Sequence, residues 1–231
     1  MKRVTLDELV AARSAEKPVA LVTVLESGVQ AVIYADTPPD TVPIGAAAVS
    51  AAQRALLDDR SVTVETEDST LFVHVYSPPR RMFIVGAVHI AQALVPMAGL
   101  AGYAVTVIDP RRAFVTDERF PFAKVVKEWP DKALERLAPD KRSAIITLTH
   151  DPKLDEPTLR VALKSEAFYI GALGSKKTQA ARRERLAQAG FTEQTLSRLH
   201  GPVGLPVGAR TPGEIAIAIM AEITQTLRAT S

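Results

Sequence analysis

The stretch Met82-Phe-Ile-Val-Gly86-Ala-Val-His89-Ile-Ala91 decides the fold of the second half of the chain. Its first four residues are apolar and are followed at once by a glycine, after which the helical pattern of 89–100 begins. An apolar strand that ends in a glycine turn and leads directly into a helix is typical of a βαβ unit. The stretch therefore predicts a buried strand at 82–85, in a sheet that helices cover.

Strands and helices go on alternating from this point to the end of the chain. We expect further strands at 104–108, 125–126, 144–148 and 167–171, and helices at 132–137, 156–165, 175–189, 192–199 and 212–227. Alternation of this kind indicates parallel strands joined by crossover helices. The predicted fold class is therefore α/β, with a Rossmann-like parallel sheet domain in the C-terminal part.

The N-terminal part has a different pattern, which is typical of a small α+β domain. Helices are expected at 4–12 and 46–57, strands at 19–25, 30–34, 61–65 and 70–76, and a rigid proline-rich connector at 37–43. Ser77-Pro-Pro-Arg-Arg81 then stops both helix and strand, because proline lacks the N–H group that either would use. We place the domain boundary in this segment and expect domains at 1–79 and 80–231.

The composition excludes several classes of protein. The 231 residues hold 28 basic and 26 acidic side chains, so the net charge of +2 creates no strong field for nucleic acid or an anionic membrane. There is no cysteine, which excludes disulfides and thiolate metal sites, and with only four histidines we expect no metal site. No apolar run approaches the roughly 18 residues of a membrane helix, and the N-terminus lacks a signal-peptide pattern. We therefore expect a cytoplasmic protein.

The first glycine loop matches a dinucleotide-binding fingerprint only in part. Gly86 and Ala91 fit its outer positions, but Val88 stands where a glycine would let the backbone approach a pyrophosphate. Asp109 follows the second expected strand, at the place of a ribose-binding acid, whereas the arginines at 111–112 could instead attract a phosphate. Contact with a ribose or phosphate and a plain structural turn both remain open.

A second polar group, Thr149-His150-Asp151, ends the strand expected at 144–148. A histidine beside carboxylates at the carboxyl end of a strand favours a role as an acid or base, or as a ligand. The alternative is that Asp151 and Asp155 cap and charge the next helix, and we expect Asp155 to act as its cap.

A third loop, Gly171-Ala-Leu-Gly174-Ser175-Lys176-Lys177, joins a strand to a helix. Its backbone N–H groups and lysines favour an anion site. The alternative is a glycine turn in which Ser175 caps the helix and the lysines are solvated. Arg182, Arg183 and Arg185 are expected on a solvated face of that helix.

The last loop contains Gly204 and Gly208, which allow a close approach to a ligand. It leads into Thr211-Pro-Gly-Glu214, a capping box with proline at the first helical position. Of the histidines outside these loops, His89 is expected near the pocket, whereas His74 and His200 are expected to be structural.

Taken together, these motifs resemble the XdhC/CoxI family of accessory proteins of molybdenum hydroxylases. The resemblance covers about residues 82–226. It is carried by Gly86-Ala-Val-His89, Val107-Ile-Asp-Pro-Arg111, Arg119-Phe-Pro121, Thr149-His-Asp151, Tyr169-Ile-Gly-Ala-Leu-Gly-Ser175, Gly204-Leu-Pro-Val-Gly208 and Thr211-Pro-Gly-Glu-Ile-Ala216.

The resemblance implies a function in handling molybdenum cofactor, a pterin with a dithiolene and a phosphate. Such a protein would bind the cofactor, protect it, present it for sulfuration and deliver it to an apo molybdenum hydroxylase, so a cofactor sulfurase is a second expected partner. The phosphate would suit the loop at 174–176. The expected binding residues are Gly86, Ala87, His89, Asp109, Arg111, Thr149, His150, Asp151, Gly171, Gly174, Ser175, Lys176, Gly204 and Gly208, with the loops forming a cleft and Asp109 at its rim.

Two departures from the family pattern keep alternatives open. Val88 replaces a family glycine, and the helix near Gly45-Ala-Ala-Ala48 lacks a family cysteine, which argues against a thiol-dependent role. One alternative is an NAD(P)-dependent Rossmann oxidoreductase, although Val88 predicts weak dinucleotide binding. The other is a non-catalytic scaffold for the hydroxylase. A homodimer is expected because symmetric pairs are the commonest soluble assembly.

Overall fold

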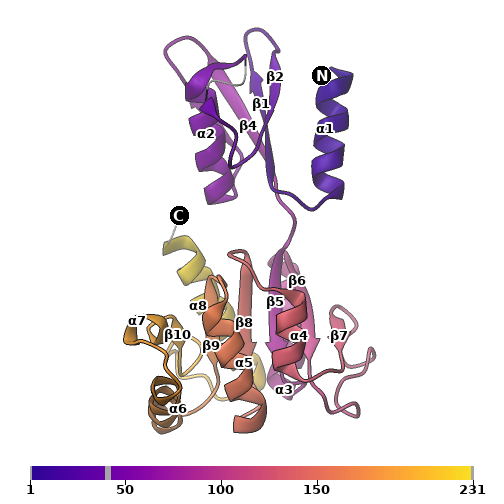
Figure 1. The fold of residues 1–231 in the computed structure, drawn as a ribbon. Coiled ribbons are helices and arrows are strands. Elements are labelled where there is room, and N and C mark those ends of the chain that lie inside the picture. Colours follow the sequence, from indigo (N-terminus) through magenta and orange to yellow (C-terminus); the bar gives the residue numbers. More distant parts are fainter. Residues whose placement is uncertain (1, 40–42, 230–231) are drawn as a thin grey trace. The chain divides into compact units, whose positions relative to one another are not determined.

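The computed structural model describes residues 2–39 and 43–229, so residues 40–42 of the proline-rich connector lie outside the described part. The described residues form two compact units, which follow one another in sequence at Pro78 and Pro79 (Figure 1).

The first unit contains an antiparallel sheet of four strands in the order β2-β1-β4-β3. Its elements are α1 (Arg3–Ser14), β1 (Val19–Val24), β2 (Gln30–Ile33), α2 (Gly45–Asp58), β3 (Val62–Glu65) and β4 (Thr70–Tyr76). One face of the sheet packs on α2 through small and β-branched residues such as Ala52 and Val73. The other face packs on α1, which contributes Leu9 and Ala12. The expected helices and strands of this part are confirmed.

The second unit contains a parallel sheet of six strands in the order β10-β9-β8-β5-β6-β7. The strands are β5 (Arg80–Val85), β6 (Tyr103–Ile108), β7 (Lys124–Val126), β8 (Ser143–Thr147), β9 (Tyr169–Ala172) and β10 (Leu199–His200). Read from β7, the chain order of the strands is 3-2-1-4-5-6, which is the order of a dinucleotide-binding Rossmann fold. The predicted α/β fold class is therefore confirmed.

Helices cover both faces of this parallel sheet (Figure 1). They are α3 (His89–Leu100), α4 (Pro130–Leu137), α5 (Pro152–Lys164), α6 (Lys176–Gln188), α7 (Glu193–Leu196) and α8 (Pro212–Ala229). Met82 and Ile84 of β5 pack in the core with α3 and α8. Phe83 and Val85 face the opposite way, into the core that α4 and α5 complete. This alternation explains why all four residues from Met82 to Val85 are apolar.

The strand order reverses between β5 and β8, the two neighbours in the middle of the sheet. The connections after these strands run in opposite directions along the sheet, and open α/β sheets bind ligands at the carboxyl ends beside such a point. The residues at this position are Gly86, directly after β5, and Thr149, directly after Leu148 at the end of β8.

Two element boundaries differ from the prediction. α5 begins at Pro152, four residues before the expected start, because Asp151 rather than Asp155 is its cap. The helix expected at 192–199 is only one turn long, and the last residue of that range, Leu199, begins β10, which continues the sheet beside β9. Among the described residues, no helix is long and apolar enough to cross a membrane.

Candidate functional site

Asp109 joins the end of β6 to the loop that follows β5. Its carboxylate accepts a hydrogen bond from the backbone N–H of Ala87, at 2.9 Å. It also accepts bonds from Arg111, from the backbone N–H at 3.0 Å, from Nε at 2.9 Å and from Nη2 at 2.6 Å. Both carboxylate oxygens are therefore occupied by the protein itself. The sequence placed Asp109 at the rim of a cleft, but the residue is fully buried.

These bonds change the acidity of the carboxyl group. Burial by itself raises the pKa of Asp109, but the hydrogen bonds from Arg111 and from Ala87 N–H outweigh burial. The pKa of Asp109 therefore lies below its ordinary value, because the hydrogen bonds stabilise the charged carboxylate by more than burial destabilises it. Asp109 is an anionic anchor of the two loops.

A cavity of about 470 Å³ lies beside the first turns of α3. Its lining residues are Ala87, Val88, His89, Gln92, Arg111, Phe114 and Arg119, and we call it the α3 cavity. It is formed by the β5–α3 loop, by α3 itself and by the connection between β6 and β7. Four residues of the predicted family motifs, Ala87, His89, Arg111 and Arg119, therefore share one cavity.

Arg119 was not among the expected binding residues, although it belongs to one of the motifs that carry the family resemblance. Its Nη1 donates to the carbonyl of Phe114 at 2.5 Å, and its Nη2 donates to Gln92 Oε1 at 3.2 Å. These bonds fix the guanidinium between α3 and the β6–β7 connection. The sequence carries no signal that Arg119 lines a cavity. Its partners are a backbone carbonyl and a glutamine amide, and neither forms a recognisable charge pair with an arginine.

Gly86 and Thr149 lie against each other where the strand order reverses. Gly86 has φ +108°, and a Cβ built on it would lie 2.7 Å from Thr149 Cγ2 and 3.3 Å from Thr149 N. A side chain at position 86 is thus excluded both by conformation and by space. The 86–89 and 149–151 loops are therefore in contact at this point.

Behind this contact lies a buried polar network. Thr149 Oγ1 donates to Asp155 Oδ1 at 2.5 Å, and Arg182 Nη2 donates to Asp155 Oδ2 at 3.1 Å. Arg182 Nη1 donates to Gln179 Oε1 at 2.7 Å, and Gln179 Nε2 donates to the carbonyl of Ala172. The network therefore connects the end of β8, α5, α6 and the end of β9.

Two predictions about this network were wrong. Arg182 was expected on a solvated face, but its residue is only 3% exposed, because it turns inward to a carboxylate on α5. Asp155 was expected to cap α5, but it lies inside the helix and is fully buried. Burial raises the pKa of Asp155, while the hydrogen bond from Thr149 and the charge of Arg182 oppose that rise. Arg183 and Arg185 stay at the surface, with acidic partners.

The rest of the 149–151 loop faces outward. His150 is exposed and has φ +59°, in the left-handed region that side chains with a Cβ seldom adopt. Asp151 caps α5 by accepting a hydrogen bond from Lys153 N at 2.9 Å. The charge of Asp151 also raises the pKa of Arg111, behind the larger effect of Asp109, so this loop lies near Arg111.

The contacts of the 171–176 loop fit the alternative interpretation, a glycine turn in which Ser175 caps α6 and the lysines are solvated. Gly171 is buried, and a Cβ there would lie 2.6 Å from Val203 Cγ2 and 2.8 Å from the Tyr169 ring. Gly174 has φ +142°. Ser175 caps α6 by accepting from Thr178 N. Lys176 is exposed.

The 204–208 loop is held by α8. A Cβ on Gly204 would lie 3.1 Å from the backbone of Ala218, and Gly204 N donates to Glu222 at 2.8 Å. Gly208 has φ +79° and open space around it. The capping box that begins α8 is confirmed, because Thr211 and Glu214 exchange the expected hydrogen bonds.

Glu222 of α8 also receives a hydrogen bond from the hydroxyl of Tyr169, at 2.5 Å. The ring of His200 stacks on Tyr169, with 4.6 Å between centroids, and its Nδ1 lies 3.3 Å from Glu222. Burial raises the pKa of Tyr169, and the bond to Glu222 adds to that rise. These contacts make His200 part of the packing beneath the 204–208 loop.

The structure therefore brings together three of the expected groups: the 86–89 loop, Asp109 with Arg111, and the 149–151 loop. The loops at 171–176 and 204–208 do not line the α3 cavity. The 171–176 loop is linked to Thr149 by the Asp155–Arg182 network, and the 204–208 loop is bonded to α8. Among the described residues, no group of three acidic or histidine side chains could hold a metal ion.

Comparisons with known proteins agree with this architecture. Residues 82–223 match the XdhC Rossmann domain family. The chain is 32% identical over 164 residues to a probable xanthine dehydrogenase subunit of Bacillus subtilis, in an alignment that covers 69% of this chain and 47% of that protein. It is 28% identical over 148 residues to the molybdenum cofactor insertion chaperone PaoD of Escherichia coli, covering 64% of this chain and 40% of that protein.

A solved structure extends the likeness to both units. The crystal structure of a xanthine dehydrogenase from Bacillus halodurans aligns with 99% of this chain and 65% of that chain, with a TM-score of 0.74 and 28% identity. The chain spans less than half the length of the two curated relatives named above. The family match covers more than half of the 231 residues, as the sequence motifs predicted, and the chain belongs to the XdhC family.

Proposed function

We propose that this protein binds molybdenum cofactor and assists its maturation and insertion into a molybdenum hydroxylase of the xanthine dehydrogenase type. The observation that carries the proposal is the cationic α3 cavity at the carboxyl edge of an XdhC Rossmann sheet. The relative PaoD, named as a molybdenum cofactor insertion chaperone, supports the same role.

The cavity fits a small anionic ligand with a flat ring system. Arg119 supplies positive charge, Arg111 adds a guanidinium that is paired with Asp109, and Phe114 supplies an aromatic ring in the same lining. The side chains of Asp109 and Asp155 are engaged with arginines, so they hold the loops rather than react. The function is therefore binding and transfer, with the 86–89, 109–111 and 149–151 segments around the ligand and the 171–176 and 204–208 loops in support.

The alternative of an NAD(P)-dependent oxidoreductase is disfavoured by Asp109. A dinucleotide site needs this acid to accept hydrogen bonds from the ribose hydroxyls. Here Ala87 and Arg111 already occupy both oxygens. Val88 adds a side chain to the lining of the cavity where the fingerprint has a glycine.

The partners follow from the proposed function. An apo molybdenum hydroxylase would receive the cofactor, and a sulfurase would modify it while it is bound. The chain has no cysteine, so any sulfur would have to come from that second protein and not from a thiol of this one. We propose that the protein acts in the cytoplasm as a homodimer, which sedimentation equilibrium would test.

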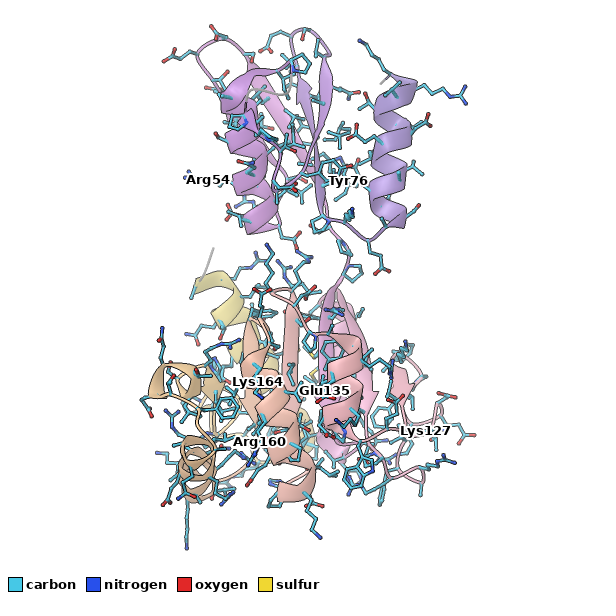
Figure 2. The ribbon with its side chains drawn as sticks, in the orientation of Figure 1. Arg54, Tyr76, Lys127, Glu135, Arg160 and Lys164 are labelled. Carbon is cyan, nitrogen blue, oxygen red and sulfur yellow. The ribbon has the colours of Figure 1, made fainter. Side chains whose placement is uncertain are left out.

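Cofactor retention tests the proposal directly. The purified protein is mixed with molybdenum cofactor released from a carrier protein and then separated by gel filtration under anaerobic conditions. We expect molybdenum, measured by mass spectrometry, and pterin, measured as its fluorescent oxidation product, to elute with the protein. Arg160→Gln should retain the cofactor as the wild type does, because this exposed arginine lies on α5 in a separate groove between α4 and α5 (Figure 2). Elution of the protein without pterin or molybdenum would refute the proposal.

A second measurement separates cofactor binding from delivery. The loaded protein is added to an apo-hydroxylase of the xanthine dehydrogenase type, and the appearance of hydroxylase activity is followed. We expect faster activation than with an equal amount of free cofactor. Cofactor retention without faster activation would favour storage over insertion, and activation without retention would favour the scaffold alternative.

A further inference from the structure

We infer that the α3 cavity binds a phosphomonoester, that Arg119 carries the charge that holds it, and that Arg111 excludes a nucleoside ribose. The inference deepens the proposed function and rests on it only where the phosphomonoester is taken to be that of the cofactor. It assigns the phosphate to a different place from the 174–176 loop that the sequence favoured.

The side chains that line the α3 cavity are basic or neutral. Two arginines and His89 line the cavity, and the described lining residues include no carboxylate. α3 begins directly at this cavity, its N-cap Val88 has no side-chain hydrogen bond to offer, and its first turn has no acidic residue. No residue of this 12-residue helix neutralises its positive end. The nearby carboxylate of Asp109, which accepts from Ala87 N–H, is paired with Arg111, so Arg119 and the helix end are the positive groups left at the cavity.

Arg119 is the cation that remains available. Its hydrogen-bond partners, Phe114 O and Gln92 Oε1, are neutral oxygens, and among the described residues no carboxylate pairs with it. A guanidinium has five N–H donors, so several remain after these bonds. The bonds also fix the orientation of the group toward the cavity. An anion that enters meets a preorganised donor whose charge is not compensated by the protein.

Arg111 differs from Arg119, because its charge is compensated by Asp109. Its Nη2 lies 2.6 Å from Asp109 Oδ2, and its guanidinium stacks on the Phe114 ring with 4.8 Å to the centroid. Arg111 therefore occupies the carboxylate of Asp109, which a nucleotide would need unpaired to bind its ribose hydroxyls. A ribose would have to displace Arg111 from a carboxylate that is fully buried. We therefore assign Arg111 to specificity, against nucleosides and in favour of a ligand with no ribose.

The 174–176 loop lacks the corresponding features. Ser175 already uses its hydroxyl to cap α6, by accepting from Thr178 N, and it pairs with Thr178 Oγ1. Lys176 is exposed and lines no part of the α3 cavity. The glycines of the loop are explained by packing against Tyr169, Val203 and Thr178.

Titration calorimetry of the full chain with phenyl phosphate tests the role of Arg119. We expect the wild type to bind this ring-bearing phosphomonoester, and Arg119→Gln to weaken binding about tenfold or more, because the variant loses a hydrogen bond from a charged donor. Arg160→Gln serves as the control, since it removes an arginine outside the cavity. Lys176→Gln should also bind as the wild type does. A Lys176→Gln variant that loses binding while Arg119→Gln keeps it would overturn the inference.

The role of Arg111 is tested by comparing ligands with and without ribose. The ratio of the affinity for AMP to that for phenyl phosphate should rise about tenfold or more in Arg111→Ala, because Asp109 is then free to accept from ribose hydroxyls. Arg111→Met is the second variant, since its aliphatic chain keeps packing on Phe114 if the alanine variant does not fold. An unchanged ratio in a folded variant, or micromolar binding of NAD or NADP by the wild type, would overturn this assignment.

The two proposals fail in different ways. If Arg119→Gln binds phenyl phosphate as tightly as the wild type, the inference is refuted and the proposed function stands. If the wild type binds phenyl phosphate but never retains molybdenum cofactor, the proposed function is refuted and the inference stands.

Discussion

Asp155 and Arg182 form a buried ion pair, with 3.1 Å between Asp155 Oδ2 and Arg182 Nη2. Their side chains are 0% and 4% exposed, although they lie on different helices. The pair therefore joins α5 to α6, and through Thr149 it reaches the end of β8. The network therefore links the 149–151 loop to the 171–176 loop, because Arg182 also donates to the carbonyl of Leu173.

Removal of one partner should destabilise the fold strongly. Arg182→Met leaves Asp155 buried without a cation, and we expect a loss of about 3–5 kcal/mol in the free energy of unfolding in urea. The double variant Asp155→Asn/Arg182→Met should lose less than Arg182→Met alone, because no unpaired charge remains. Equal losses in the single and double variants would show that packing, and not charge, explains the effect.

The contact of Gly86 with Thr149 predicts a partial rescue. Gly86→Ala places a Cβ 2.7 Å from Thr149 Cγ2 at a φ of +108°, so we expect a loss of about 1–3 kcal/mol in stability. Thr149→Ser removes that methyl group and keeps the hydroxyl that bonds Asp155. The double variant should recover the steric part of the loss in urea unfolding and retain the conformational part. A double variant as stable as Thr149→Ser would contradict the role of φ.

Asp109 should make stability depend on pH in the acid range. Its pKa in the folded protein lies below the ordinary value of about 3.9, so the unfolded chain takes up the proton first as pH falls. The stability that the charged carboxylate contributes is thus complete above the unfolded pKa and is lost as pH falls through the folded pKa. The difference in unfolding free energy between the wild type and Asp109→Asn should shrink as pH falls below about 5. A difference that stays constant as the solution is acidified would contradict the assignment.

Tyr169 and Glu222 give a test on the other face of the sheet. Tyr169→Phe removes a hydrogen bond to a carboxylate, and we expect a loss of about 1.5–3 kcal/mol in thermal or urea unfolding. Tyr103→Phe is a matched control, because Tyr103 is also buried and its hydroxyl makes no hydrogen bond with the described residues. Similar losses in both variants would show that the bond to Glu222 contributes little.

The topology of the second unit was readable from the sequence because its signals are local. The apolar strand at 82–85, the glycine that follows it and the helical pattern of 89–100 are continuous in the chain, and each was confirmed. β10 was not predicted, since a two-residue strand has no periodicity and forms only because β9 offers it an edge.

The site was less readable, because its chemistry depends on long-range pairs. Arg182 was predicted to be solvated because its helix is charged all round, and its partner Asp155 lies 27 residues away. Asp109 and Arg111 are two residues apart, yet their side chains form a bidentate ion pair only because the chain bends at the end of β6. Side-chain direction at the ends of strands and helices is set by tertiary contacts, which a single sequence does not contain.

His150 has a conformation that its side chain disfavours. A residue other than glycine or asparagine in the left-handed region costs roughly 1–2 kcal/mol, and exposed His150 makes no hydrogen bond with the described residues that would offset this. His150→Gly should therefore unfold at the same or a higher urea concentration than the wild type, and a lower midpoint would contradict the presence of strain. If cofactor retention falls in the same variant, His150 lowers the stability of the fold but is needed for cofactor binding. A more stable version of this protein would then be a poorer carrier.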